Sequence, residues 1–262
     1  MKSDDRRAAC CYAAALTLIL WSLLRFPAWF SRLPEALQKD RLSVYCCNAV
    51  HQLLTFGLPA LLILYARRAR WADYKGSLRP VSPRKAAVCG LAALSGTATV
   101  SMIAWASAHL IRALTGYTGG SELLPAPQGA AQWGLALAAV AVLPALCEEL
   151  LFRALIQGVI FRRLPRAGIW LAALAFAALH RRWDVFPALL LIGAALGGIC
   201  RRHGFYAAWL THALYNAAVL IFSARMTQLS LPFALVCAAV CALALRLLIG
   251  KEPTDETDGA GL

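Results

Sequence analysis

Charged residues are scarce in this sequence, and acidic residues are scarcest. Charged residues make up 15 % of the 262 residues, against about 25 % in soluble domains. Hydrophobic residues make up 60 %, which excludes a soluble globular domain. It also excludes disorder for most of the chain, because disorder needs low hydrophobicity and high net charge. The class that fits is an all-α polytopic membrane protein.

A net charge of +13 would suggest nucleic-acid binding in a soluble protein. Here the basic residues lie between apolar stretches, where they act as topology signals and contact anionic lipid headgroups. We therefore expect the lipid bilayer, and no nucleic acid, as a partner. The nine cysteines form no C-x-x-C pair and no cluster with zinc-finger spacing. We interpret them as small apolar residues of helices.

Apolar stretches predict about eight transmembrane helices, most of them near the roughly 20 residues that cross a bilayer. The stretches are 8–24, 44–66, 86–111, 131–161, 167–183, 185–200, 205–224 and 228–249. The fourth is too long for one straight crossing, and we expect a kink at Pro144. With the N-terminus inside, basic residues on the inner side outnumber those outside by about two to one, which predicts that both termini are cytosolic.

The chemistry-bearing residues divide the chain into three parts. Residues 1–125 hold transmembrane helices without a motif, 126–250 hold the expected functional core, and 251–262 form an acidic tail that we expect to be disordered. An ionisable group in the hydrocarbon core costs about 2.5–3.5 kcal/mol on insertion scales, so such groups usually have a function. They are concentrated in the core part, in its fourth, fifth and seventh stretches.

The fourth stretch carries the acidic pair Glu148 and Glu149, followed by Arg153. In a helix, Glu149 and Arg153 are four residues apart and can pair, whereas Glu148 points about 100° away. Arg153 therefore neutralises Glu149 and leaves Glu148 available as a general base. The alternative interpretation is a structural Glu–Arg–Glu cluster that ties helices together.

Histidines and an amide lie in the later stretches. His180 belongs to the fifth, and His212 and Asn216 lie four residues apart in the seventh. Two hydrogen-bond donors on one face can stabilise an oxyanion. We count the depth of each polar group from the expected cytosolic end of its stretch, at about 1.5 Å per helical residue. The polar groups of the three stretches then lie at overlapping depths in the membrane. The alternative is plain hydrogen bonding between packed helices.

Three motifs in order resemble the signature of the CPBP family of intramembrane endopeptidases, which covers CAAX-protein proteases and bacteriocin-processing enzymes. The family pattern is Glu-Glu-x-x-x-Arg, then Phe-x-x-x-His, then His-x-x-x-Asn or Asp, on successive helices. The chain has Glu148-Glu149-Leu-Leu-Phe-Arg153, Phe176-Ala-Ala-Leu-His180 and His212-Ala-Leu-Tyr-Asn216. The resemblance covers about 130–220.

The resemblance implies a membrane endopeptidase with its active site inside the helix bundle. Glu148 would activate a water, His180 would hold or polarise that water, and His212 with Asn216 would form the oxyanion site. Glu149 and Arg153 would be a supporting pair. We favour catalysis without a metal; if zinc takes part, Glu148, His180 and His212 could supply the roughly three ligands that it needs.

Other membrane proteins fit these residues less well. The chain lacks the Gly-x-Ser-Gly of rhomboid-like proteases, the two intramembrane Asp of presenilin-like proteases and the His-Glu-x-x-His of zincins. A proton-coupled transporter could use the same ionisable residues, and an immunity or scaffold protein would need no catalysis. The composition suggests a bacterial cytoplasmic membrane protein. We expect a peptide or protein substrate in or at the membrane.

Overall fold

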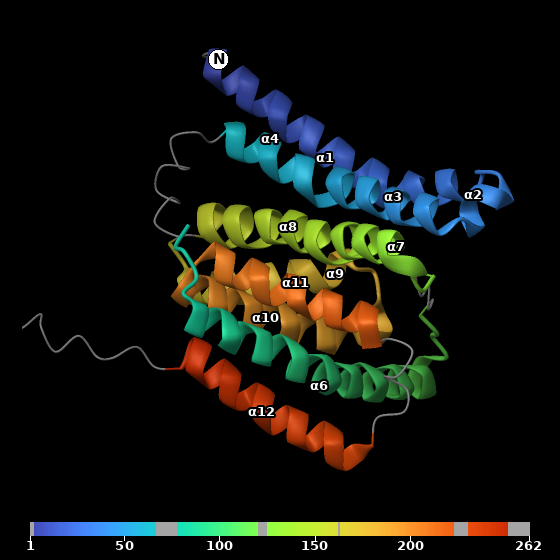
Figure 1. Cartoon of the computed structure of the whole chain (residues 1–262). Coiled ribbons are helices and arrows are strands. Elements are labelled where there is room, and N and C mark those ends of the chain that lie inside the picture. Colours follow the sequence, from blue (N-terminus) through green and yellow to red (C-terminus); the bar gives the residue numbers. More distant parts are fainter. Residues whose placement is uncertain (1–2, 67–77, 120–124, 162, 223–229, 251–262) are drawn as a thin grey trace, which may run out of the picture.

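The computed structural model describes residues 3–66, 78–119, 125–161, 163–222 and 230–250. These residues form helices and no strand, and the helices lie nearly side by side in one bundle (Figure 1). The all-α prediction is therefore confirmed. The acidic tail predicted at 251–262 lies outside the described residues.

The N-terminal part forms one outer layer of the bundle (Figure 1). Helix α1 (Ser3–Phe30) packs against α4 (Leu58–Ala66). Along the chain, α1 is followed by α2 (Glu35–Lys39), α3 (Arg41–Gln52) and the π-helical segment η1 (Leu53–Gly57), which lead to α4. Asp40 caps α3, because its carboxylate accepts a hydrogen bond of 2.8 Å from the Ser43 backbone N–H. Segments α3, η1 and α4 follow one another as the second predicted span.

Helix α6 (Pro83–Thr115) is the third predicted span and the longest helix described, at 33 residues. Ser82 caps its start, and Pro83 occupies the first turn, where a missing N–H costs nothing. Gly116 ends the helix with a left-handed φ of 73°, a conformation that favours glycine.

The fourth predicted span is a helix that changes its winding. It consists of α7 (Gly129–Ala136), the π segment η3 (Leu137–Val142), α8 (Leu143–Glu149) and the π segment η4 (Leu150–Ile160). Pro144 lies directly after η3, where the winding returns to α. A wide π turn before a proline makes room for the pyrrolidine ring and tolerates the absence of the proline N–H.

The C-terminal part consists of α9 (Pro165–Leu179), the short 3-10 segment η5 (Trp183–Val185), α10 (Phe186–His203), α11 (Phe205–Phe222) and α12 (Leu231–Ile249). The predicted stretch 167–183 is wrong at its end. Helix α9 stops at Leu179, with His180 as its C-cap. The reason is local, because Arg181 takes a left-handed φ of 55°, which a helix cannot continue through.

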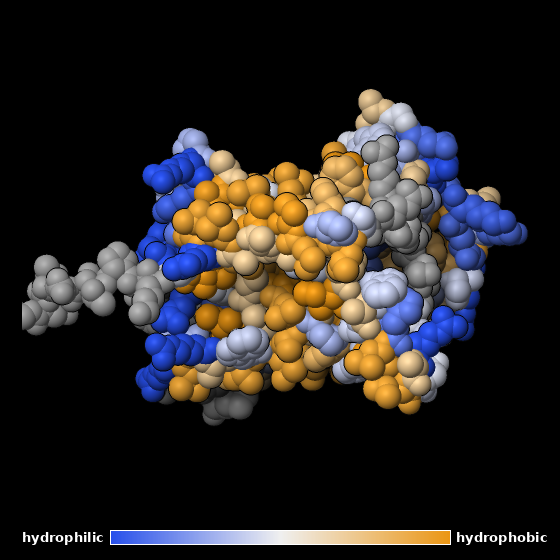
Figure 2. Space-filling model, turned by 90° about the horizontal axis from the view of Figure 1, so that it is seen from below, coloured by the Kyte–Doolittle hydropathy of each residue, from blue (hydrophilic) through white to orange (hydrophobic). Residues whose placement is uncertain are grey.

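Among the described residues, seven helices are long and apolar enough to cross a membrane, and Pro165–Leu179 is a shorter apolar helix. The face of the molecule seen in Figure 2 has an apolar band between two hydrophilic ends. Large side chains on the outside of the bundle are exposed, among them Leu24, Leu235 and Val236. Such a belt is what a bilayer covers. The chain is therefore an integral membrane protein.

Helix α8 lies in the middle of the bundle, between the N-terminal layer and the C-terminal helices (Figure 1). It contacts α3 and η1 on one side and α11 on the other. Close contacts between α9 and α10 depend on small residues, as is usual for helices in membranes. At Gly193 of α10, an added Cβ would come within 2.9 Å of the Ala173 Cα of α9.

Candidate active site

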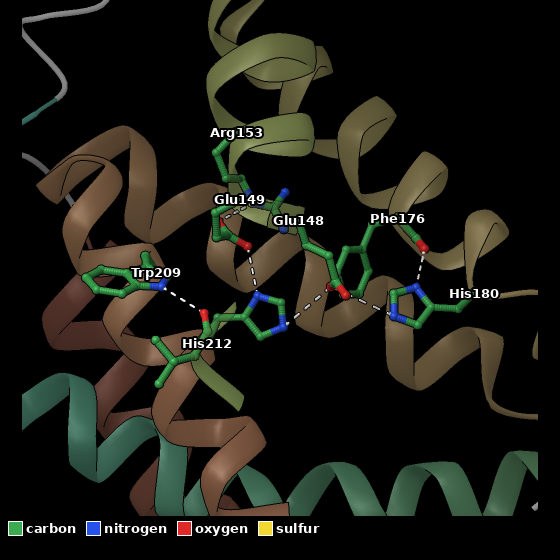
Figure 3. Close-up of polar contacts among 8 residues, drawn as sticks. Glu148, Glu149, Arg153, Phe176, His180, Trp209 and His212 are labelled. Carbon is green, nitrogen blue, oxygen red and sulfur yellow. Dashed lines mark hydrogen bonds and ion pairs between the residues drawn. The ribbon is translucent and has the colours of Figure 1, made fainter. Parts of the chain in front are cut away.

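Two adjacent carboxylates occupy the centre of the bundle. Glu148 and Glu149 are the last two residues of α8, and their exposed fractions are 4 % and 0 %. Successive residues of a helix point about 100° apart, so the two side chains have different neighbours (Figure 3). The predicted divergence of Glu148 from Glu149 is present in the structure.

Glu149 is held by a cation on its own helix and by a histidine on another. Its Oε2 accepts a hydrogen bond of 2.9 Å from Nε of Arg153, and both side chains are fully buried. The predicted Glu149–Arg153 pair is therefore present, although η4 winds as a π-helix. Oε1 of Glu149 lies 3.0 Å from Nδ1 of His212 in α11. A carboxylate accepts and cannot donate, so Nδ1 of His212 carries the hydrogen.

His180 is oriented by the backbone of its own helix. Its Nδ1 lies 2.7 Å from the carbonyl oxygen of Phe176, which fixes the hydrogen on Nδ1. The Phe176 ring packs against the rings of His180 and His212, with centroids 4.5 Å and 5.9 Å away. Phe176 thus sets the position of His180 through both its ring and its carbonyl.

The two histidines converge on Glu148 from different helices (Figure 3). Oε2 of Glu148 lies 3.9 Å from Nε2 of His180 and 3.7 Å from Nε2 of His212. Both distances exceed a direct hydrogen bond, so Oε2 of Glu148 faces both rings without bonding directly to either. With both Nδ1 atoms committed to other partners, the two Nε2 atoms are the ring atoms that face this space.

A cavity of about 360 Å³ adjoins these groups. Glu148, His180, His212 and Asn216 all line it, so the four residues predicted to be catalytic are brought together. Apolar side chains form much of the remaining wall, among them Val140, Leu189, Ile192 and Val219. A concave, largely apolar site with a few convergent polar groups is typical of ligand and substrate sites.

Within the described part of the chain, no group of three His, Cys, Asp or Glu side chains is arranged to hold a metal ion. All nine cysteines are free thiols. Two other histidines lie apart from the site: His109 packs on Trp105 of its own helix, and His51 stacks on Phe26 of α1.

Residues 130–218 match the family model described as type II CAAX prenyl endopeptidase Rce1-like. This match agrees with the CPBP family that the three motifs resemble. The family resemblance of the three motifs is thereby confirmed, and every residue assigned to the site lies inside the match. None of the curated proteins and none of the solved structures matches the chain. The match of this segment supports a CAAX-type intramembrane endopeptidase in general.

Three features of this site were not predicted from the sequence. The first is the contact between Glu149 and His212, and the second is the hydrogen bond from His180 to the Phe176 carbonyl. The four-residue spacing of Phe176 and His180 could have indicated the second. The third is that Asn48 and Gln52 of α3, outside the matched segment, line the same cavity.

Proposed function

We propose that this protein is an intramembrane endopeptidase in which Glu148 activates the attacking water. The observation that carries the proposal is the convergence of the Nε2 atoms of His180 and His212 on one oxygen of Glu148. A water held there can donate one hydrogen to Glu148 and the other to His180. Its lone pair is then directed toward a substrate carbonyl in the adjoining cavity.

The reaction follows from these positions. Glu148 takes a proton from the water while the water oxygen forms a bond to the scissile carbonyl carbon. The carbonyl oxygen becomes an oxyanion, to which Nε2 of His212 and the side-chain amide of Asn216 donate hydrogen bonds. Glu148 then passes its proton to the amide nitrogen, and the carbon–nitrogen bond breaks. The products are a new carboxylate and a new amine, and Glu148 is regenerated.

The contact between Glu149 and His212 defines what the oxyanion role requires. Nδ1 of His212 already donates to Glu149, so Nε2 can donate to an oxyanion only if the ring is a fully protonated imidazolium. With the ring in that form, the local charges balance. Glu148 and Glu149 are two anions, and Arg153 and His212 are two cations. Buried charges in a low-dielectric site need this kind of balance.

Further parts of the proposal concern the substrate and the membrane. The substrate is a polypeptide in or at the membrane, and the reaction uses no resident metal. The distribution of basic residues supports both termini in the cytosol, and the composition supports a bacterial membrane. The hydrophilic ends of the molecule and the apolar band between them support a position in which the two ends lie on opposite sides of the bilayer (Figure 2).

The experiment is a comparison of peptide termini in membranes from cells that produce the wild type or Glu148→Gln. The substitution preserves shape and removes the base, so both proteins should insert equally. Termini found only with the wild type would establish proteolysis and identify the substrate and its cut site. Identical sets of termini, with equal amounts of both proteins, would reject the protease in favour of a transport, immunity or scaffold role.

A further inference from the structure

The cavity has a second set of polar residues, which the proposed chemistry does not use. Asn48 and Gln52 lie on α3, in the N-terminal layer of the bundle, and both line the cavity that holds Glu148. They are four residues apart and therefore share one face of the helix. The family match begins only at residue 130, so these two residues are not part of it.

The amide of Asn48 is oriented by a backbone hydrogen bond that is missing from the fourth span. In η3 the backbone bonds reach five residues back, as from Leu143 to the carbonyl of Ala138. The next bond would run from Pro144 to Ala139, but proline has no N–H. Nδ2 of Asn48 donates to the Ala139 carbonyl instead, at 2.9 Å. This leaves the amide oxygen of Asn48 as the group that a ligand in the cavity can use.

Gln52 presents an acceptor that lacks a donor. Its Oε1 is buried and has no hydrogen-bond partner among the described residues. A buried acceptor without a partner is costly, and such a cost persists where a ligand supplies the missing donor. Both side chains line the same cavity. Because Oε1 of Gln52 has no exposed surface here, its amide has to turn toward the cavity to meet a ligand, and a ligand that satisfies both amide oxygens must carry two N–H groups.

The rise between the two residues along α3 is close to the repeat of an extended peptide. Four helical residues span about 6 Å along the axis. In an extended chain, N–H groups on the same side recur every second residue, at about 6.6–6.8 Å. A transmembrane helix cannot serve as this ligand, because its N–H groups are already bonded within the helix. The apolar walls of the cavity suit the apolar side chains of such a segment.

We propose that Asn48 and Gln52 bind the main chain of the substrate, in an extended conformation, beside the reacting carbonyl. This inference rests on the proposed proteolysis and adds the class of substrate. The cleaved segment is an apolar stretch of polypeptide that is unwound where it enters the site. Because the contacts are to the main chain, they select an extended conformation and not a particular sequence.

Gln52 is the better residue for a test, since removing Asn48 would also leave the Ala139 carbonyl unsatisfied. Gln52→Leu removes the unpartnered acceptor and keeps the side-chain size, so the variant should be as stable as the wild type or more stable. Its KM for the cleaved polypeptide should rise about 2- to 10-fold, the worth of one hydrogen bond, with kcat changed much less. Gln52→Glu, which keeps an acceptor, should retain more binding than Gln52→Leu. A lower thermal stability with unchanged KM would assign Gln52 a structural role and overturn the inference.

The decisive experiment is photo-crosslinking in the Glu148→Gln protein, which should hold its substrate uncut. A benzophenone amino acid is placed at position 52 or, as a matched control on the same helix, at Val50, which is 47 % exposed on the outside of the bundle. The polypeptide that the wild type cleaves should crosslink at 52 and not at 50. Crosslinking at 50 alone, equally at both positions or at neither would overturn the inference while cleavage by the wild type still stands. If the wild type cleaves nothing, the proposed function fails, and this inference fails with it.

Discussion

Nδ1 of His212 lies 3.0 Å from Oε1 of Glu149, and the other oxygen of Glu149 is held by Arg153 at 2.9 Å. One buried carboxylate therefore links a cation of the fourth span to a histidine of α11. Glu149 is a positioning residue in this account, since it acts on the chemistry through His212. The predictions below follow from this link and from the packing around it.

Arg153→Ala should damage both folding and activity. It would leave Glu149 buried without its cation, and breaking a buried pair costs about 3–5 kcal/mol. We expect less protein in the membrane and a clearly lower melting temperature in detergent. The double variant Glu149→Gln with Arg153→Met removes both charges and should recover much of the stability, because a buried pair can often be replaced by neutral groups at little cost.

The same double variant should remain a poor enzyme, since His212 loses the carboxylate that holds its Nδ1 and balances its charge in the proposed mechanism. A fully active double variant would contradict the role given to Glu149. Normal accumulation and full activity of Arg153→Ala would contradict the pairing itself.

Gly193→Ala should impair activity through α9. The new Cβ would lie 2.9 Å from the Ala173 Cα and 3.0 Å from the Ala173 Cβ, so α9, which carries His180 at its end, must shift. Overpacking of this kind costs about 1–3 kcal/mol. The measurements are the melting temperature and kcat/KM. The matched control is Gly134→Ala on α7, where nothing lies within 4 Å of the new Cβ; it should be neutral or slightly stabilising. Equal behaviour of the two variants would contradict the close α9–α10 contact.

Asp40→Ala should destabilise the start of α3, the helix that carries Asn48 and Gln52. Hydrogen bonds from the backbone and side chain of Ser43 lower the pKa of Asp40 below its usual 3.8. The carboxylate therefore contributes stability above its unfolded pKa and loses it as pH falls through the lowered value. The difference in melting temperature between wild type and variant should be present at neutral pH and shrink below about pH 4. Asp40→Asn, which can still cap the helix, should lose less; a pH-independent difference would contradict the assignment.

Chelators should leave the purified enzyme active. Among the described residues, no three metal-binding side chains are arranged around one ion, and a catalytic zinc needs about three protein ligands. Activity would be measured after dialysis against EDTA and 1,10-phenanthroline. Loss of activity that returns on adding zinc, and not magnesium, would overturn the metal-free mechanism.

The sequence was sufficient to predict the helices and the group of site residues. Long apolar stretches form helices in a bilayer, because a helix satisfies its own backbone hydrogen bonds. Ionisable residues at similar depths in these stretches indicate that the helices meet around Glu148. The four-residue spacing was enough to predict the Glu149–Arg153 ion pair, since both residues belong to one continuous helical span.

Features that depend on contacts between helices could not be read in the same way. The hydrogen bond from His212 to Glu149 joins residues 63 positions apart. The hydrogen bond from Asn48 to the Ala139 carbonyl, which Pro144 cannot satisfy, joins α3 to η3. Neither has a local signal. The end of α9 was misplaced for another reason: an apolar stretch continues past Leu179 in composition, while the left-handed Arg181 ends the helix.

The central claim is that Glu148 is the base that activates water. The most direct measurement is kcat/KM for cleavage of the substrate by purified, reconstituted wild type, Glu148→Gln and the surface control Glu35→Gln. General-base catalysis contributes about 100- to 10,000-fold, so Glu148→Gln should lose at least about 100-fold in kcat/KM at unchanged folding, while Glu35→Gln stays at the wild-type level. Cleavage by well-folded Glu148→Gln at a rate comparable to the wild type would contradict the account.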